Sequence, residues 1–345
     1  MVIVSLHVLE ELPKVDLHVH LDGCVKPRTL LSLAELQGIP LPTYEANGLL
    51  TYLQVDGGCN NLSDYLVKFD FVLPFLQTKE ALVQVAWEVV AEASVHRIRY
   101  IEVRFAPQLH RHNGLTTEEA INAVIQGLNK GEEQFGVKAR VIAICMRNHS
   151  FGANLEVVES AASFYGKGLV AVDLAGDEAS YPAELFRQVF RLARQRGIPI
   201  TIHAGEAAGP DNIEEAVVNL GARRIGHGVR LKENVRVMEM IREQRIPLEL
   251  CPTSNIQTRS VTGWDCYPIR EYFEQGILFT VNTDNPGVSG TNITQEYKVL
   301  ADKFGFSLAE ITALILNGVE ASFLDGEEKA ALRREFDESF NRLVV

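Results

Sequence analysis

Two histidines, His18 and His20, close the apolar run at residues 15–20. Residues two apart on a β-strand project to the same side. A strand over this run would therefore present both imidazoles to one surface, where they could bind a metal ion. On its own, the pattern more often marks two ordinary polar residues at a strand end. Its meaning depends on what else the fold brings near it.

Three further apolar runs end in residues that could also bind a metal ion: His203, His227 and Asp284. Imidazole nitrogens and carboxylates are ligands that zinc prefers, and a catalytic zinc also holds a water whose pKa it lowers. Glu206 could supply an acid or a base, or it could be a solvated loop carboxylate or a helix cap. The other histidines are expected to be structural or solvated: His7, His96, His110, His112 and His149.

These side chains can meet only if the runs that carry them end at one place. Eight short, β-rich apolar runs recur, at 15–20, 100–105, 140–146, 169–174, 200–203, 224–227, 248–251 and 278–282. Helical patterns lie between them, as at 117–135, 183–196 and 233–245. Eight strand–helix units predict an α/β fold of the (β/α)8 TIM-barrel type, whose strand ends share one mouth. The runner-up, a doubly wound open sheet, lacks its Gly-x-Gly-x-x-Gly turn here.

The spacing of the runs predicts two additions to this barrel. The first and second runs are separated by 21–99, and helical patterns at 64–76 and 79–95 lie in that gap. We expect one (β/α)8 domain over residues 1–345, with a helical insertion or lid at 40–97 beside the barrel mouth. The tail from Leu308 predicts two extra C-terminal helices packed outside the barrel.

Composition limits the partners and the compartment. The chain has 33 Lys and Arg against 45 Asp and Glu, a net charge of −12, which disfavours binding to nucleic-acid phosphates. No apolar run is long enough for a membrane span, and the N-terminus lacks the basic segment of a signal peptide. Five cysteines without a Cys-x-x-Cys pair suit a reducing compartment. We expect a cytoplasmic protein with no nucleic-acid or membrane partner, and we predict no protein partner.

Six segments, in order and at barrel-like spacing, carry a family resemblance. They are LPKVDLHVHLDG at 12–23, DLAGDE at 173–178, HAGE at 203–206, GHG at 226–228, CPTSN at 251–255 and NTD at 282–284. Through them the chain resembles the adenosine deaminase family of the amidohydrolase superfamily, from about Leu12 to the C-terminal helices.

The resemblance implies zinc-dependent hydrolytic deamination of adenosine and 2′-deoxyadenosine to inosine and 2′-deoxyinosine, with release of ammonia, in purine salvage. It implies one zinc per chain, held by His18, His20, His203 and Asp284. Glu206 would protonate purine N1, and His227 would orient the attacking water and take up its proton. The chemistry agrees, because water must attack C6 while N1 and the leaving nitrogen gain protons.

The same resemblance implies how a purine nucleoside would bind. His20 would contact the substrate, Asp22 would bind a ribose hydroxyl, and the N–H of Gly176 would meet N3 of the base. Asn285 stands where the family has a second aspartate, whose protonated carboxyl donates to N7. An asparagine amide donates at any pH, so purine binding could persist without that negative charge. The substitution leaves the exact substrate open.

The helical pattern of the insertion places Leu62, Tyr65, Phe69 and Leu73 on one face. We favour a buried packing stripe there. The alternative is a lid, formed by Leu62, Tyr65 and Phe69, over the ribose.

Other adenine-type substrates stay open: adenine, adenosine phosphates, and N6-substituted or otherwise modified adenine nucleosides. A phosphate would favour a nearby arginine or lysine, whereas Asp22 places a carboxylate near the sugar. One rival function is a binuclear hydrolase of the same superfamily, but the fourth run ends at Ala175 and Gly176 without the bridging lysine such enzymes use. The other rival, a non-catalytic barrel, would not need the full set of candidate ligands together with Glu206 and His227.

Overall fold

The computed structural model describes residues 4–55, 59 and 62–343. These residues form parallel strands in two four-stranded sheets, ordered β1-β2-β3-β4 and β5-β6-β7-β8. The strands are β1 (Lys14–His20), β2 (Ile98–Phe105), β3 (Lys138–Met146), β4 (Leu169–Ala175), β5 (Thr201–Ala204), β6 (Arg224–His227), β7 (Leu248–Leu250) and β8 (Phe279–Val281).

Backbone bridges join the two sheets at both seams. Val172 on β4 bridges Ile200, which precedes β5, and Val19 on β1 bridges Asp284, which follows β8. At the second seam the N–H of His20 donates to the Asp284 carbonyl at 2.8 Å. The fold is therefore the predicted (β/α)8 barrel, and the carboxyl ends of its strands open on one mouth.

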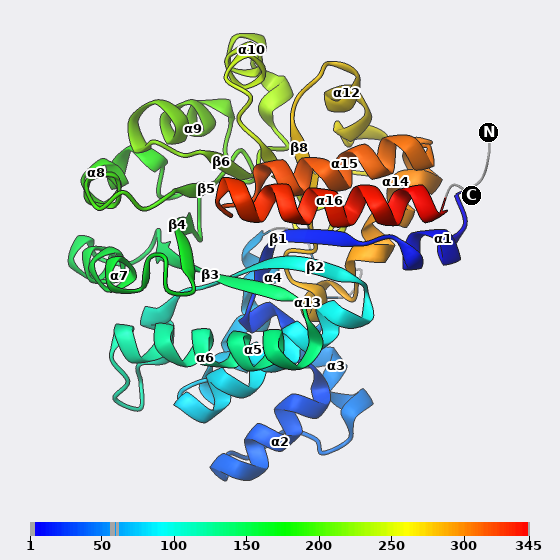
Figure 1. Cartoon of the computed structure of the whole chain (residues 1–345). Coiled ribbons are helices and arrows are strands. Elements are labelled where there is room, and N and C mark those ends of the chain that lie inside the picture. The colour runs from blue at the N-terminus through cyan, green and yellow to red at the C-terminus, as the bar shows by residue number, and fades with distance from the viewer. Residues whose placement is uncertain (1–3, 56–58, 60–61, 344–345) are drawn as a thin grey trace.

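Helices surround this barrel (Figure 1). They are α1 (Leu6–Glu11), α2 (Pro27–Gln37), α3 (Ala46–Leu53), α4 (Leu62–Val72), α5 (Lys79–Val95), α6 (Thr117–Phe135), α7 (Phe151–Phe164), α8 (Arg187–Gln195), α9 (Pro210–Glu215), α10 (Val235–Glu243), α11 (Pro252–Gln257), α12 (Ile269–Glu274), α13 (Pro286–Ser289), α14 (Ile293–Phe304), α15 (Leu308–Ala321) and α16 (Gly326–Leu343). No helix within the described ranges is long and apolar enough to cross a membrane.

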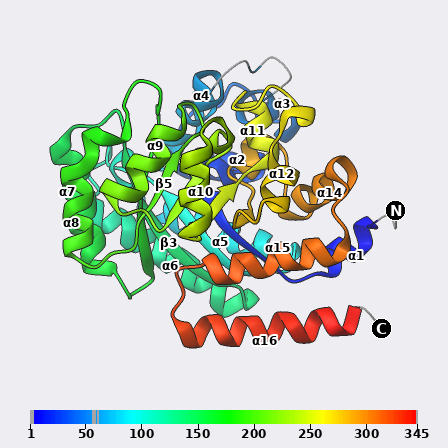
Figure 2. The same cartoon turned by 90° about the horizontal axis from the view of Figure 1, so that it is seen from above.

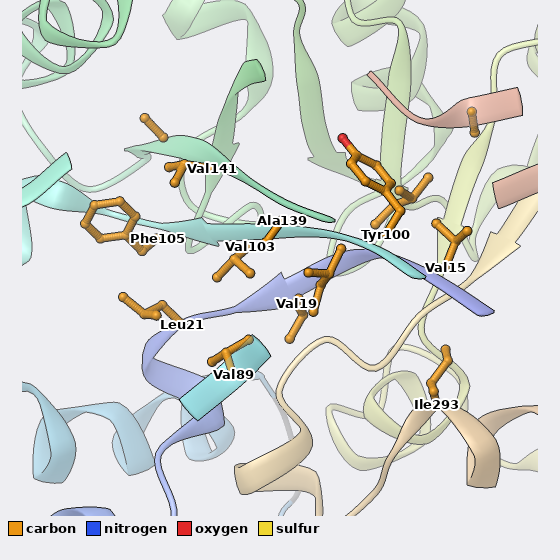
Figure 3. Packing of buried hydrophobic residues seen from close by; sticks show 14 of the residues in the cluster. Val15, Val19, Leu21, Val89, Tyr100, Val103, Phe105, Ala139, Val141 and Ile293 are labelled. Carbon is orange, nitrogen blue, oxygen red and sulfur yellow. The ribbon is translucent and has the colours of Figure 1, made fainter. Parts of the chain in front are cut away.

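The main hydrophobic core lies around the barrel strands. Val15 and Val19 of β1 and Val103 of β2 belong to it, together with Val89 of α5 and Ile293 of α14 (Figure 3). Strands covered on both faces favour the nearly continuous apolar runs seen in the sequence. A few buried charged side chains interrupt those runs, and they prove to organise the site.

The insertion and the C-terminal helices are present. Helices α2, α3 and α4 follow β1, and α5 then returns to pack against β2 and α6. Helix α15 packs on β1 and β8, so it is one of the helices that cover the barrel strands, whereas α16 packs against α15. Both helices predicted for the tail from Leu308 are therefore present outside the barrel strands. Figure 2 shows α16 and α4 at opposite ends of the molecule.

Candidate active site

Three strand ends bring the four predicted metal ligands around one point. His18 and His20 lie on β1, His203 lies on β5, and Asp284 follows β8. The Nε2 atom of His20 is 3.3 Å from Nε2 of His203 and 3.3 Å from Oδ1 of Asp284. The Nε2 atom of His18 is also 3.3 Å from that carboxylate oxygen. Three imidazole nitrogens and one carboxylate oxygen thus converge.

This donor set fits a divalent cation of the zinc type. The Nε2 atom of His18 is buried and makes no hydrogen bond, a costly state that a cation would relieve. Two overlapping groups could also hold a metal, His18 with His203 and His227, and His227 with Cys251 and Asp284. Burial raises the pKa of the Cys251 thiol well above its usual value.

Buried carboxylates orient two of the ligand imidazoles through their other ring nitrogen. Nδ1 of His18 lies 2.8 Å from Oε2 of Glu249, and Nδ1 of His203 lies 3.1 Å from Oδ1 of Asp173. Arg104 donates to both carboxylates, at 2.7 Å to Glu249 and 2.9 Å to Asp173. Each imidazole is therefore held with its Nε2 directed at the shared point, as metal-binding histidines commonly are.

Two strands end at the site in strained backbone. His227 and Asp284 have φ angles of 63° and 62°, in the left-handed region that non-glycine residues rarely adopt. Such strain persists where the surrounding structure imposes it, often at functional sites. Ser254 donates to Oδ2 of Asp284 at 2.6 Å, which leaves Oδ1 towards the histidines.

Glu206 lies beside this cluster and is 6% exposed. One of its carboxyl oxygens is 3.6 Å from Nε2 of His227. Burial, followed by the negative charges of Asp284 and Glu178, raises the pKa of Glu206 to about 8. A carboxyl with this pKa is largely protonated at neutral pH, so it can act as an acid.

The tautomer of His227 follows from its neighbour Asn255. The backbone N–H of Cys251 can only donate, and it faces Oδ1 of Asn255 at 3.4 Å, where the Tyr267 hydroxyl also donates at 3.0 Å. The Asn255 amide nitrogen therefore faces Nδ1 of His227, at 2.9 Å. Nδ1 must accept this hydrogen bond, which places the proton of the neutral ring on Nε2. Burial keeps the ring neutral by lowering the His227 pKa well below its usual value.

A cavity of about 260 Å³ opens over the cluster. Asp22, Gly176 and Asn285 line it, as does one face of α4. The residues around it that sequence analysis selected are His20, Asp22, Leu62, Tyr65, Phe69, Leu73, Gly176, His203, Glu206, His227, Asp284 and Asn285. His18 lies below them, fully buried.

Asn285 reaches this cavity because its neighbour is a glycine. A Cβ atom on Gly23 would lie 2.1 Å from Oδ1 of Asn285, so no larger residue fits there without displacing the amide. Asn285 is 4% exposed, and its Oδ1 atom has no hydrogen-bond partner. Burial raises the pKa of the nearby Asp22 to about 6.

The apolar face of α4 combines the two alternatives considered for it. Tyr65 is 1% exposed and packs with Val288 of α13 and with Phe69, as a buried stripe would. Its hydroxyl also shares a hydrogen bond of 2.7 Å with Ser289. Leu62, Tyr65 and Phe69 nevertheless face the cavity. The stripe therefore both packs and forms a wall of the site.

Sequence analysis gave no role to several residues that organise the site. They are Arg104, Asp173, Glu178, Glu249, Ser254 and Asn255. A usable signal existed for three of them, because Arg104, Asp173 and Glu249 are charged residues inside apolar strands. Such residues are rarely buried without a partner. The other histidines lie outside the potential metal-ligand groups found among the described residues.

Comparison with known proteins agrees with this geometry. Residues 13–339 match the family model described as adenosine deaminase. The chain is 42% identical over 325 residues to an adenosine deaminase of Clostridium botulinum strain Okra, covering 94% of this chain and 97% of that protein.

Solved structures agree as well. The fold is similar to an adenine deaminase from Arthrobacter aurescens, with a TM-score of 0.89, 28% identity, and coverage of 95% of this chain and 99% of that one. It is also similar to an amidohydrolase from Burkholderia ambifaria with bound zinc, with a TM-score of 0.88, 26% identity, and coverage of 100% and 96%. On the extent of the family match and of the sequence identity, this chain belongs to the adenosine deaminase family.

Proposed function

We propose that the protein hydrolyses adenosine and 2′-deoxyadenosine to inosine and 2′-deoxyinosine, with release of ammonia. One observation carries the proposal: the converging imidazoles and Asp284 share a cavity with Glu206, whose pKa is about 8. The family to which the chain belongs supports the same activity.

His18, His20, His203 and Asp284 would hold one zinc ion per chain. Zinc, when bound, supplies a nucleophilic water at neutral pH. The potential ligand groups found in the described part of the chain all overlap, which supports one metal centre rather than the two of a binuclear hydrolase. The zinc-containing relative supports the choice of metal.

Glu206 would donate its proton to N1 of the purine, which reduces the aromaticity of the ring and makes C6 open to attack. We assign His227 a different part from the one expected from sequence. With its ring proton on Nε2 and its Nδ1 accepting from Asn255, His227 can donate a hydrogen bond to the attacking water but has no free lone pair for a proton. It would therefore orient and stabilise the nucleophile. The Glu206 carboxylate, ionised once it has protonated N1, would take up the proton of the attacking water and pass it to the leaving nitrogen.

The remaining polar groups of the cavity would hold the nucleoside. We assign Asp22 to a ribose hydroxyl, the Gly176 N–H to N3 and the Asn285 amide to N7, with His20 beside the reacting carbon. The face of α4 within the 40–97 insertion would cover the ribose as a lid. No arginine or lysine of the described residues lines this cavity, which favours a nucleoside over a nucleotide.

Free adenine is the second candidate substrate, because the structurally similar Arthrobacter protein is an adenine deaminase. N6-substituted and other modified adenine nucleosides would need extra room at C6. We place the enzyme in the cytoplasm, because the described residues contain no disulfide and Cys24, Cys145, Cys251 and Cys266 are free thiols.

The experiment measures zinc content by elemental analysis and follows adenosine by its absorbance, with inosine identified chromatographically. Glu206→Gln should keep zinc and lose about 10²- to 10⁴-fold in turnover, the usual contribution of general acid catalysis. Glu239→Gln, which removes an exposed carboxylate, is the control and should behave as wild type. Near-normal turnover by the Glu206→Gln variant would reject Glu206 as the proton donor. If the protein converted adenine but not adenosine, adenine would replace adenosine as the proposed substrate.

A further inference from the structure

The carboxylate of Glu178 binds the backbone of the segment that carries Glu206. Glu178 follows β4 and is 2% exposed. Its Oε1 accepts the N–H of Gly205 at 2.7 Å, and its Oε2 accepts those of Glu206, Ala207 and Ala208 at 3.0, 2.8 and 3.0 Å. Four N–H donors on one buried side chain require acceptors only, which a carboxylate offers and an amide does not.

This segment lies in a loop between β5, which ends at Ala204, and α9, which begins at Pro210. Gly205 adopts a φ of 70°, so the chain turns sharply there. A side chain on such a loop is placed accurately only if the surrounding structure holds the backbone. Arg147 holds the start of the turn, donating to the carbonyl oxygen of His203 at 2.8 Å.

We propose that Glu178 is a positioning residue for Glu206: its hydrogen bonds to residues 205–208 set where the Glu206 carboxyl meets the substrate. The inference rests on the proposed function, in which Glu206 is the proton donor. Glu178 does not line the substrate cavity, so it acts through the backbone it binds.

The charge of Glu178 supports the same role. Burial is the main reason for the raised pKa of Glu206, and the charges of Asp284 and Glu178 add to it. Charged and titratable groups facing Glu206 are Asp284, Glu178, His18, His227 and Arg147. Removal of one negative neighbour makes the ionised form of Glu206 less unfavourable, so its proton is lost at lower pH.

Glu178→Gln tests both effects with little change of shape. Its amide would direct a donor at one or more of the four N–H groups and would carry no charge. We expect kcat on adenosine to fall by about 10²-fold, the order that a displacement of roughly 1 Å causes. The alkaline limb of kcat/KM should move to lower pH, and zinc content should not change. Amide hydrogen exchange at 205–208, measured without substrate, should become faster.

Asp177→Asn is the matched control, because this neighbouring carboxylate accepts from the N–H of Ser180, at 3.1 Å, instead of from residues 205–208. This control variant should keep the wild-type kcat, the wild-type alkaline limb of kcat/KM and the wild-type rate of amide hydrogen exchange at 205–208. Glu178→Asp keeps the charge and shortens the reach, so it should lose turnover while the limb stays near its wild-type position. This variant tests the same geometry if the glutamine protein does not fold.

The inference would be overturned if the Glu178→Gln variant had the same kcat, the same alkaline limb of kcat/KM and the same amide hydrogen exchange at 205–208 as the Asp177→Asn variant. Loss of zinc from Glu178→Gln would overturn it too, because the effect would then arise at the metal centre. A wild-type protein inactive on adenosine, or a fully active Glu206→Gln, would instead reject the proposed function. Hydrogen exchange needs no turnover and would still show whether Glu178 holds the segment.

Discussion

Glu206 and Asn285 show how single side chains depend on their surroundings. An exposed glutamate is ionised at neutral pH and cannot donate a proton. The buried Glu206, close to Asp284, has its pKa raised to about 8. Asn285 has the opposite property, because its amide cannot ionise and donates at every pH. The site thus combines one donor that depends on pH with one that does not.

The proposed acid role predicts a loss of activity in alkaline solution. Glu206 donates a proton only when its carboxyl is protonated. The value of kcat/KM for adenosine should therefore fall as the pH rises through about 8, and ionisation of Glu206 should not lower it at more acidic pH. Initial rates between pH 6 and 10 in buffers of constant ionic strength measure it. A flat profile across the range would contradict donation by Glu206.

A contact between Asn285 and purine N7 predicts a specific coupling. Asn285→Leu should lower kcat/KM on adenosine by about one to two decades, since an unpaired buried polar group costs about 1–3 kcal/mol. On 7-deazaadenosine, which lacks the N7 acceptor, the same substitution should cost almost nothing further. Equal losses on both substrates would mean that Asn285 only supports the turn before Pro286.

At the scale of elements, the strand ends need small residues so that the imidazoles can approach one another. Gly226 on β6 lies behind two ligand rings. A Cβ atom there would be 3.2 Å from Cε1 of His18 and 3.3 Å from Cγ of His203. Neither ring can move freely, because Glu249 and Asp173 hold them by hydrogen bonds. The glycine would therefore be part of the proposed metal site although it offers no ligand.

Gly226→Ala should consequently weaken zinc binding by about 10- to 100-fold, the size of effect that disturbed ligand orientation usually has. Competition with a chelator, followed by zinc analysis, gives the affinity. Gly152→Ala is the control, because a Cβ atom on this residue of α7 meets nothing within 4 Å. If the two variants bind zinc equally well, the crowding argument is wrong.

At the scale of the whole molecule, buried ion pairs connect the barrel interior to the proposed metal site. Arg224 on β6 donates to Glu249 at 2.6 Å and to Glu102 at 2.5 Å, and Glu249 also holds His18. These side chains are at most 1% exposed. A charge in this network that loses its partner remains buried and unpaired, so the network joins overall stability to the geometry of the site.

Removal of Arg224 should therefore destabilise the whole fold. Arg224→Met leaves Glu102 without its arginine partner and leaves Glu249 with Arg104 alone, so it should lower the free energy of unfolding by about 3–5 kcal/mol. Urea denaturation followed by circular dichroism measures the change. Arg245→Met, which breaks an exposed pair with Glu320, should leave the midpoint nearly unaltered. Similar midpoints for both variants would show that the buried network adds little.

The sequence by itself predicted the barrel, its eight strands and the residues at their ends. Strand periodicity and helix periodicity are local properties, so the runs at 100–105 and 140–146 are recognisable without knowing what they pack against. The observed strands β2 and β3 contain these runs and begin two residues earlier. Parallel strands connected by helices then place His203 and Asp284 at a common mouth. The candidate ligands and Glu206 could be selected on these grounds alone.

The tertiary structure alone decided how these residues are held. His18 takes its partner Glu249 from a strand 231 residues away, and no local pattern contains that pairing. The tautomer of His227 depends on Asn255, and the pKa of Glu206 depends on burial and on the charges of Asp284 and Glu178, which follow other strands. Residue types and spacings give the candidates, but hydrogen-bond direction and desolvation arise only when the barrel brings distant strands together and excludes water.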